Sequence, residues 1–160
     1  MTTRLIWAQT PSGVIGDGEK LLWELPEDMK FFAEKTRHST VVMGRKTWDS
    51  LPAKVRPLPS RKNVVISRTI SELEGATVSD DLSAVLQSGN REDIWVIGGS
   101  QIYSLALPYA NEVYITRVYL DEVPGHVTAP DITDQFILRE TSGKLLSSTG
   151  IEYAFETWTR

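Results

Sequence analysis

The chain has 160 residues, a formal net charge of −4 and no cysteine, and 41% of its residues are hydrophobic. These values are typical of one soluble domain over residues 1–160, which can bury its core without disulfides or a structural metal. The acidic balance argues against a nucleic-acid-binding protein, whose affinity depends on many cations meeting phosphates. No apolar run approaches the roughly 20 residues of a membrane span. Without cysteine or a cleavable leader, we expect a cytoplasmic protein, monomeric by default.

The first part of the chain predicts a strand, a long connection and a helix. Residues 5–9 form a short apolar run, and residues 10–22 contain three glycines that indicate a loop. Pro26 is suited to the first position of a helix, where its missing N–H costs nothing. Met29 and Phe32 would then form the apolar stripe of this helix.

The middle of the chain alternates strands with helices. Residues 40–44 predict a β-branched strand and residues 45–50 a short helix, and the prolines of residues 51–61 favour an irregular segment. Residues 63–67 predict another strand, and residues 76–78 a short one.

The next segments continue the alternation. Asp80 or Asp81 would cap a helix with apolar residues 82, 85 and 86, which Gly89 would end. Residues 94–98 predict a buried strand, followed by a helix that stops near Pro108. A strand over 112–118 follows, and residues 136–140 and 151–159 predict an antiparallel hairpin across a connection at 143–150. The fold class is therefore α/β, with a mostly parallel sheet covered on both faces.

Two glycines follow the strand at 94–98. Gly98 and Gly99 carry no Cβ, so the phosphates of a ligand could approach the backbone where the strand turns into the helix. The pair is compatible with a nucleotide site and also with a simple tight turn.

Cations and hydroxyls follow two other strands, at Arg45, Lys46 and Thr47 and at Ser67 and Arg68. The carboxyl ends of parallel strands meet at one edge of a sheet, so these groups predict a phosphate site, although solvated surface cations would give the same pattern. For a dinucleotide, three cations favour a ribose 2′-phosphate and hence NADP over NAD. The usual G-x-G-x-x-G fingerprint does not follow the first strand.

Asp28 is the chemical candidate. It shares a helix face with Leu25 and Phe32, which is unusual for an unpaired acid. Its carboxylate could simply complement the helix dipole. Alternatively, it is desolvated and accepts two parallel hydrogen bonds from an amidine-like group of a ligand.

The chain resembles the bacterial dihydrofolate reductases from end to end, in seven segments that occur in the family's order. They are residues 5–8 (LIWA), 13–16 (GVIG), 23–28 (WELPED), 42–48 (VMGRKTW), 56–63 (RPLPSRKN), 95–99 (WVIGG) and 114–116 (YIT). The resemblance implies a single domain with a mostly parallel eight-stranded sheet, an antiparallel C-terminal strand and about four flanking helices. It also implies a cis peptide bond between Gly98 and Gly99.

The resemblance further implies a substrate site for dihydrofolate, which antifolate inhibitors would share. Asp28, supported by Thr116, would bind the 2-amino group and N3 of the pterin, and Arg61 would pair with the α-carboxylate of the glutamate tail. An apolar lining for the flat rings would come from Ile6, Trp7, Phe32, Leu51, Leu58, Ile97 and Tyr103.

The cofactor implied by the resemblance is NADPH, and no metal is expected. Its nicotinamide would meet Ala8, Ile15 and Gly16. Its phosphates and adenosine would be held by Gly44, Arg45, Lys46, Thr47, Ser67, Arg68, Gly98, Gly99, Ser100, Gln101, Ile102 and Tyr103.

The implied catalytic residues are Asp28, Thr116, Trp23 and Leu21. The pterin N5 would receive its proton from solvent near Trp23 and Leu21, while Asp28 favours the protonated pterin without touching N5. Residues 10–22 would form a lid over the nicotinamide.

Two other classes of protein remain to be weighed. A related reductase of the riboflavin pathway would share the cofactor end but lack the segment at 23–28 and Arg61. A non-catalytic nucleotide-binding module would keep the glycines and cations and lack an acid that faces an apolar slot.

Overall fold

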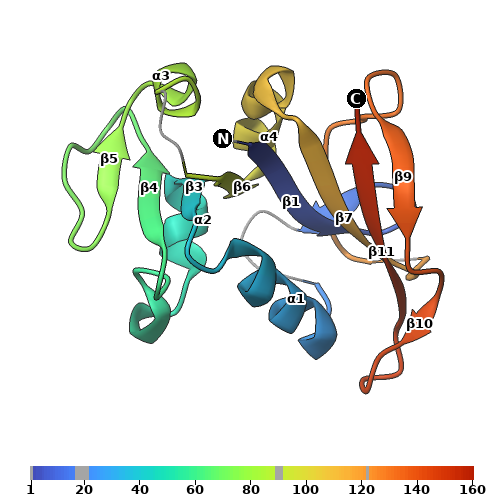
Figure 1. The fold of residues 1–160 in the computed structure, drawn as a ribbon. Helices are drawn as coiled ribbons and strands as arrows, with labels where there is room; N and C mark the ends of the chain where they lie inside the picture. Colours follow the sequence, from blue (N-terminus) through green and yellow to red (C-terminus); the bar gives the residue numbers. More distant parts are fainter. Residues whose placement is uncertain (1, 17–21, 89–91, 122) are drawn as a thin grey trace.

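The computed structural model describes residues 2–16, 22–88, 92–121 and 123–160 (Figure 1). Their main sheet contains the strands β1 (Thr3–Gln9), β3 (Thr40–Gly44), β4 (Lys62–Ile66), β5 (Thr77–Ser79), β6 (Ile94–Gly98), β7 (Glu112–Val118), β9 (Ile137–Thr141), β10 (Leu145–Leu146) and β11 (Glu152–Thr159). The helices of the described residues are α1 (Pro26–Thr36), α2 (Arg45–Ser50), α3 (Leu82–Leu86) and α4 (Ser100–Ala106), with 3₁₀ turns η1 (Ala53–Val55) and η2 (Leu107–Tyr109).

The sheet runs from β5 at one edge to β9 and β10 at the other, as Figure 1 shows from left to right. Neighbouring strands from β5 through β4, β3, β6 and β1 to β7 are parallel, whereas β11 is antiparallel to β7. Both β9 and β10 pair with β11, at its residues 156–159 and 152–153. The described sheet is therefore eight strand positions wide, which confirms the expected fold class.

Helices cover both faces of this sheet because the central strands are apolar throughout. All but the last residue of β3 are buried, as a parallel strand between two helix layers requires. On one face, side chains of α3 and α4 pack in the largest core cluster, which includes Leu82 and Tyr103. On the other, α1 and α2 contribute Phe32 and Trp48 to a second cluster.

The helix α1 begins at Pro26, as predicted, but the expected apolar role of Met29 is wrong. The Met29 side chain is 67% exposed, whereas Thr36, seven residues later on nearly the same helix face, is fully buried. This face of α1 is therefore buried at the C-terminal end of the helix and exposed near its N-terminal end. In the place of Met29, the Phe31 ring stacks on Phe155 at a centroid distance of 4.1 Å.

Three segments expected to be irregular contain short regular elements. The connection at 10–22 includes β2 (Val14–Gly16), which pairs with β8 (Val127–Thr128) in a separate two-stranded sheet. The prolines of 51–61 still permit η1, and β10 lies within 143–150. These elements have only two or three residues, too few to leave a periodic pattern in the sequence.

The helix boundaries were predicted closely. Of the two candidate caps for α3, it is Asp81 whose Oδ1 accepts a hydrogen bond from the Ala84 N–H at 3.0 Å. The helix α4 ends at Ala106, and Pro108 lies within the following turn η2. The predicted stop at Gly89 lies outside the described residues.

Candidate active site

The carboxylate of Asp28 lies where α1 meets the carboxyl end of β7. The Thr116 hydroxyl donates a hydrogen bond of 2.5 Å to Asp28 Oδ1, across 88 positions of sequence. Thr116 itself is 1% exposed, and its strand register places it beside Ala8 of β1. The pKa of Asp28 is raised because burial disfavours the charged form, and the Thr116 hydrogen bond opposes this effect. Asp28 is therefore a desolvated acid, as one of the two interpretations of the sequence required.

This desolvation predicts a cost to stability. Between the unfolded-state pKa and the raised folded-state pKa, the folded protein binds more protons, so its stability falls as pH rises. We expect Asp28→Asn, which keeps an acceptor for Thr116, to raise the free energy of unfolding at pH 7 by about 1 kcal/mol. The difference should disappear as pH falls below the unfolded pKa of about 3.9. Urea unfolding at a series of pH values measures it, and an equal difference at every pH would contradict the explanation.

Apolar side chains from several elements, α1 among them, meet in the second core cluster. Ile6 of β1 and Leu58 are buried, and Phe32, Leu51 and Ile97 pack against the same cluster while remaining partly exposed. Five of the seven residues named from the sequence as a ring lining thus occur in one cluster, whereas Trp7 and Tyr103 belong to the first core cluster. Their partial exposure leaves apolar surface available to a flat ligand.

Tyr103 of α4 is attached to β1 through its hydroxyl and its ring. Its hydroxyl donates to the Ile6 carbonyl at 2.6 Å, and its ring packs on Trp7 at a centroid distance of 4.8 Å. Burial raises the pKa of Tyr103, and the negative charge of Asp28 raises it further. The hydroxyl therefore remains neutral and attaches α4 to the middle of β1.

Arg61 is held in place by three acceptors. Its Nε donates to Thr36 Oγ1 at 2.9 Å, its Nη2 to the Ala33 carbonyl at 3.3 Å, and its Nη1 to the Pro59 carbonyl at 3.1 Å. A guanidinium has five N–H donors, so one remains on each Nη atom. Burial lowers the pKa of Arg61 and neighbouring Arg37 lowers it further, so an anion would be favoured here. This arrangement fits a carboxylate bound by two parallel hydrogen bonds.

The glycines of the cofactor end lie where α2 and α4 approach the strand ends. A Cβ on Gly98, whose φ is +138°, would stand 3.1 Å from Thr47 Oγ1, and a Cβ on Gly44 would stand 3.1 Å from Ile102. Side chains at these two positions would therefore crowd the junction. The Gly98–Gly99 peptide bond is cis, which confirms that expectation.

The three cations predicted for the phosphate site differ in their partners and in their exposure. The Arg45 Nε donates to both carboxylate oxygens of Asp49 at 3.0 and 3.1 Å, whereas Lys46 and Arg68 are exposed. Ser67 is buried and its hydroxyl lies 3.3 Å from that of Thr69. Lys46 and Arg68 are thus the cations that solvent reaches most freely.

The remaining cofactor candidates lie near the small sheet. The Ser100 hydroxyl donates to the Thr128 carbonyl at 2.8 Å, and Gln101 is exposed. Ile15 packs on the first core cluster, and Gly16 pairs with Val127. The structure therefore brings the start of α4 to the strand that pairs with residues 14–16.

Trp23 packs against the cluster of Leu25, Val118 and Tyr153 and is partly exposed. Leu21, the other residue named for solvent entry, lies outside the described residues. The same holds for residues 17–20, so only the ends of the expected lid are described.

Sequence reasoning missed Thr36, which orients Arg61. It also assigned Met29 to the apolar face, whereas Met29 presents an exposed side chain one residue after Asp28. A buried threonine near a helix end gives no periodic signal. The exposure of Met29 follows only from the packing of α1 on the sheet.

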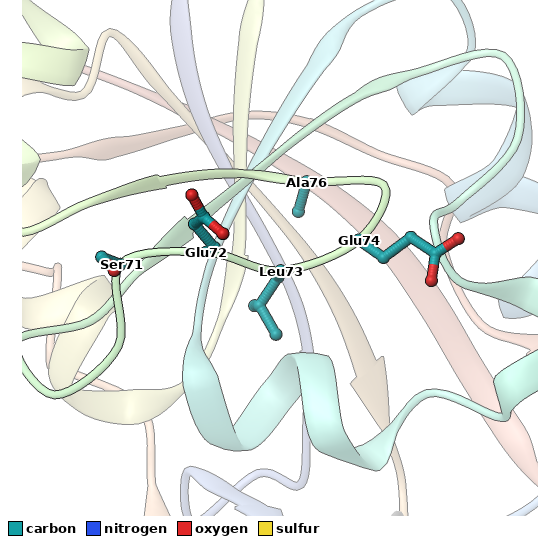
Figure 2. A pocket seen from close by; sticks show the side chains of 5 residues that line it. All are labelled: Ser71, Glu72, Leu73, Glu74 and Ala76. Carbon is teal, nitrogen blue, oxygen red and sulfur yellow. The ribbon is translucent and has the colours of Figure 1, made fainter.

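A hollow outlined by the described residues lies outside this candidate site. It measures about 520 Å³, is open to solvent, and is formed by the loop before β5 (Figure 2) with Ser71, Glu72, Leu73, Glu74 and Ala76. Leu73 packs on the second core cluster, and no residue of the hollow belongs to the candidate site. Within the described ranges, no helix is long and apolar enough to span a bilayer, and no group of acidic or histidine side chains could hold a metal ion.

Fold and site together define an α/β protein with a mostly parallel sheet and a desolvated acid hydrogen-bonded to one of its strands. The chain matches the dihydrofolate reductase family over residues 2–160. It is 47% identical to dihydrofolate reductase of Mycobacterium tuberculosis (strain CDC 1551 / Oshkosh), over 98% of this chain and 96% of that protein. It is 37% identical to that of Buchnera aphidicola subsp. Acyrthosiphon pisum (strain APS), over the whole of both chains.

A solved structure agrees with these relatives. Dihydrofolate reductase from Enterococcus faecalis, complexed with NADP(H) and RAB-propyl, superposes with a TM-score of 0.88 at 30% identity, over 99% of this chain and 96% of that one. The chain therefore belongs to the dihydrofolate reductase family. It is an enzyme, as the resemblance in its motifs implied.

Proposed function

We propose that this chain reduces 7,8-dihydrofolate to 5,6,7,8-tetrahydrofolate with NADPH, a reaction that supports one-carbon metabolism. The observation that carries the proposal is the carboxylate of Asp28, which is half-buried and hydrogen-bonded to Thr116, on the helix that also contributes Phe32 to the apolar cluster. Neither a tight turn nor a solvated cation patch requires such an acid.

Asp28 would bind the pterin through its two oxygens. The 2-amino group and N3 of the ring present two parallel donors, which match a carboxylate in bidentate geometry. The hydrogen bond from Thr116 holds Oδ1 in place and leaves lone pairs free. Phe32, Leu51 and Ile97 would cover the faces of the rings, and antifolates of similar shape would bind the same slot.

The glycine junction fits NADPH, the cofactor of this family. Absence of a Cβ at Gly44 and Gly98 leaves room for backbone approach, and Thr47 presents its hydroxyl to this junction. Ala8, Ile15 and Gly16 would bound the nicotinamide. When bound, the cofactor supplies a hydride from nicotinamide C4 to pterin C6.

The chain's own residues must then favour a proton at N5. Trp23 is partly exposed, so solvent reaches it. Water at this position is the proposed proton donor. Asp28 would not touch N5, but its negative charge would stabilise the protonated pterin. The apolar lining excludes bulk water from the rings, so the charge acts in a medium of low polarity.

The test of the proposal is the loss of NADPH absorbance when dihydrofolate is added to the purified protein, repeated with NADH. We expect turnover with NADPH and much weaker turnover with NADH. A chain that binds NADPH without consuming it would support a nucleotide-binding module and overturn the proposal. Sedimentation of the same sample tests the expected monomer.

Cofactor discrimination gives a specific prediction at Arg68. The exposed guanidinium would pair with the 2′-phosphate, a group that NADH lacks. Arg68→Gln should raise the KM for NADPH about tenfold, the scale of one lost charge-assisted hydrogen bond, and leave the KM for NADH unchanged. The matched control is Arg139→Gln, which removes an exposed arginine from β9 at the other edge of the sheet. An equal change in both KM values would contradict the assignment.

A further inference from the structure

The first turn of α1 is attached to a distant turn between β10 and β11. The Ser147 hydroxyl donates a hydrogen bond to Glu27 Oε1 at 2.6 Å, and the Ser148 N–H donates to Glu27 Oε2 at 3.0 Å. These contacts join positions about 120 residues apart. Both oxygens of one carboxylate therefore bind the same turn.

The turn that receives Glu27 is itself well fixed. Ser147 is 4% exposed, and its N–H donates to the Ile151 carbonyl at 2.8 Å. The Thr149 N–H donates to Ser147 Oγ at 3.1 Å. The Thr149 hydroxyl in turn donates to the Glu24 carbonyl at 2.9 Å, which adds a second attachment just before α1.

This attachment lies one residue from Asp28. Helix α1 begins without a side-chain cap at Leu25, so its own residues do not fix its first turn in that way. The turn at 147–149 leads into β11, which pairs with β7, the strand of Thr116. Glu27 thus attaches α1 to the turn that precedes β11, and Asp28 attaches the next position of the helix to the neighbouring strand β7.

We propose that Glu27 is a positioning residue, which holds the first turn of α1 so that the Asp28 carboxylate meets the pterin in bidentate geometry. The inference rests on the proposed function. Glu27 would touch neither substrate nor cofactor. Its hydrogen bonds to Ser147 and then to Ser148 lower its pKa to about 2, so it accepts both bonds as a carboxylate at neutral pH.

Steady-state kinetics of Glu27→Ala tests the proposal. We expect the KM for dihydrofolate to rise about tenfold, because small displacements of a binding group are costly, while the KM for NADPH stays the same. Glu27→Gln keeps one acceptor and should recover most of the loss. Ser147→Ala alone should also raise the KM for dihydrofolate. Combined with Glu27→Ala it should raise the KM little further, since both substitutions remove the hydrogen bond between Ser147 and Glu27.

The control is Asp81→Ala, which removes the cap of α3 far from Asp28. It should lower the melting temperature without changing the KM for dihydrofolate. If Glu27→Ala behaves like this control, with a lower melting temperature and unchanged KM, Glu27 is only structural and the inference is wrong.

A second measurement needs no turnover. Hydrogen exchange at the amides of Asp28 and Met29, which both donate to the Leu25 carbonyl, should be faster in Glu27→Ala than in the wild type. Unchanged exchange would overturn the inference. A wild-type chain that fails to reduce dihydrofolate would instead overturn the proposed function, so the two failures are distinct.

Discussion

Asp28→Asn is expected to lower kcat about 10²–10³-fold, the scale for losing one group that stabilises developing charge in an enclosed site. Asparagine has nearly the same shape and can still accept the hydrogen bond from Thr116. It lacks the negative charge that favours a protonated pterin, and its amide would oppose one of the pterin donors. Turnover measured by NADPH absorbance gives the result.

NADPH affinity should remain unchanged in Asp28→Asn, which cofactor fluorescence can measure. The control is Glu34→Gln, because Glu34 is an exposed acid on the same helix. It should leave kcat at the wild-type value. Near-normal turnover of Asp28→Asn would remove Asp28 from the mechanism.

Arg61→Met should raise the KM for dihydrofolate about 10²-fold and leave the KM for NADPH unchanged. Loss of a buried, bidentate partner for a carboxylate typically costs about 2–5 kcal/mol, and the partial exposure of Arg61 favours the lower end of this range. Methionine keeps an unbranched apolar side chain at this position and removes the guanidinium, whose central carbon lies 5.9 Å from the centroid of the Phe32 ring. The change therefore tests the guanidinium itself.

Arg37→Met is the matched control for Arg61→Met. Arg37 is exposed and its charge lies close enough to lower the pKa of Arg61. If only the total positive charge mattered, both substitutions would raise the KM similarly. If the orientation set by Thr36 and Ala33 matters, Arg61→Met alone has the large effect. Arg61→Lys should also raise the KM for dihydrofolate, because an ammonium group cannot form two parallel hydrogen bonds with a carboxylate as the planar guanidinium does.

Most elements of the fold could be predicted from the sequence because their signals are local. Pro26 marks a helix start, Asp81 supplies a cap, and the β-branched run at 40–44 forms a strand with the predicted bounds. The width of the sheet was expected only through the family resemblance. The local sequence pattern does not specify which strands pair with one another.

Packing decided points that the sequence pattern left open or got wrong. Met29 has the helical spacing of a core residue, yet it is exposed because nothing in the described structure covers the beginning of that face of α1. Arg45 follows β3 as predicted, and the structure adds a partner that the prediction did not include, Asp49 one helical turn away. The spacing of a residue along a helix predicts the direction of its side chain. Whether that side chain is buried or paired depends on the elements packed around it.

By itself, the sequence determined that an acid follows the start of a helix on its apolar face, and that two glycines end a buried strand. Both features depend on neighbouring residues alone. The tertiary structure decided that Thr116 supports Asp28, that Thr36 orients Arg61, and that Ser147 holds Glu27. These partners lie 25 to 120 positions apart in sequence, and strand register and helix packing, which are properties of the whole chain, bring them together.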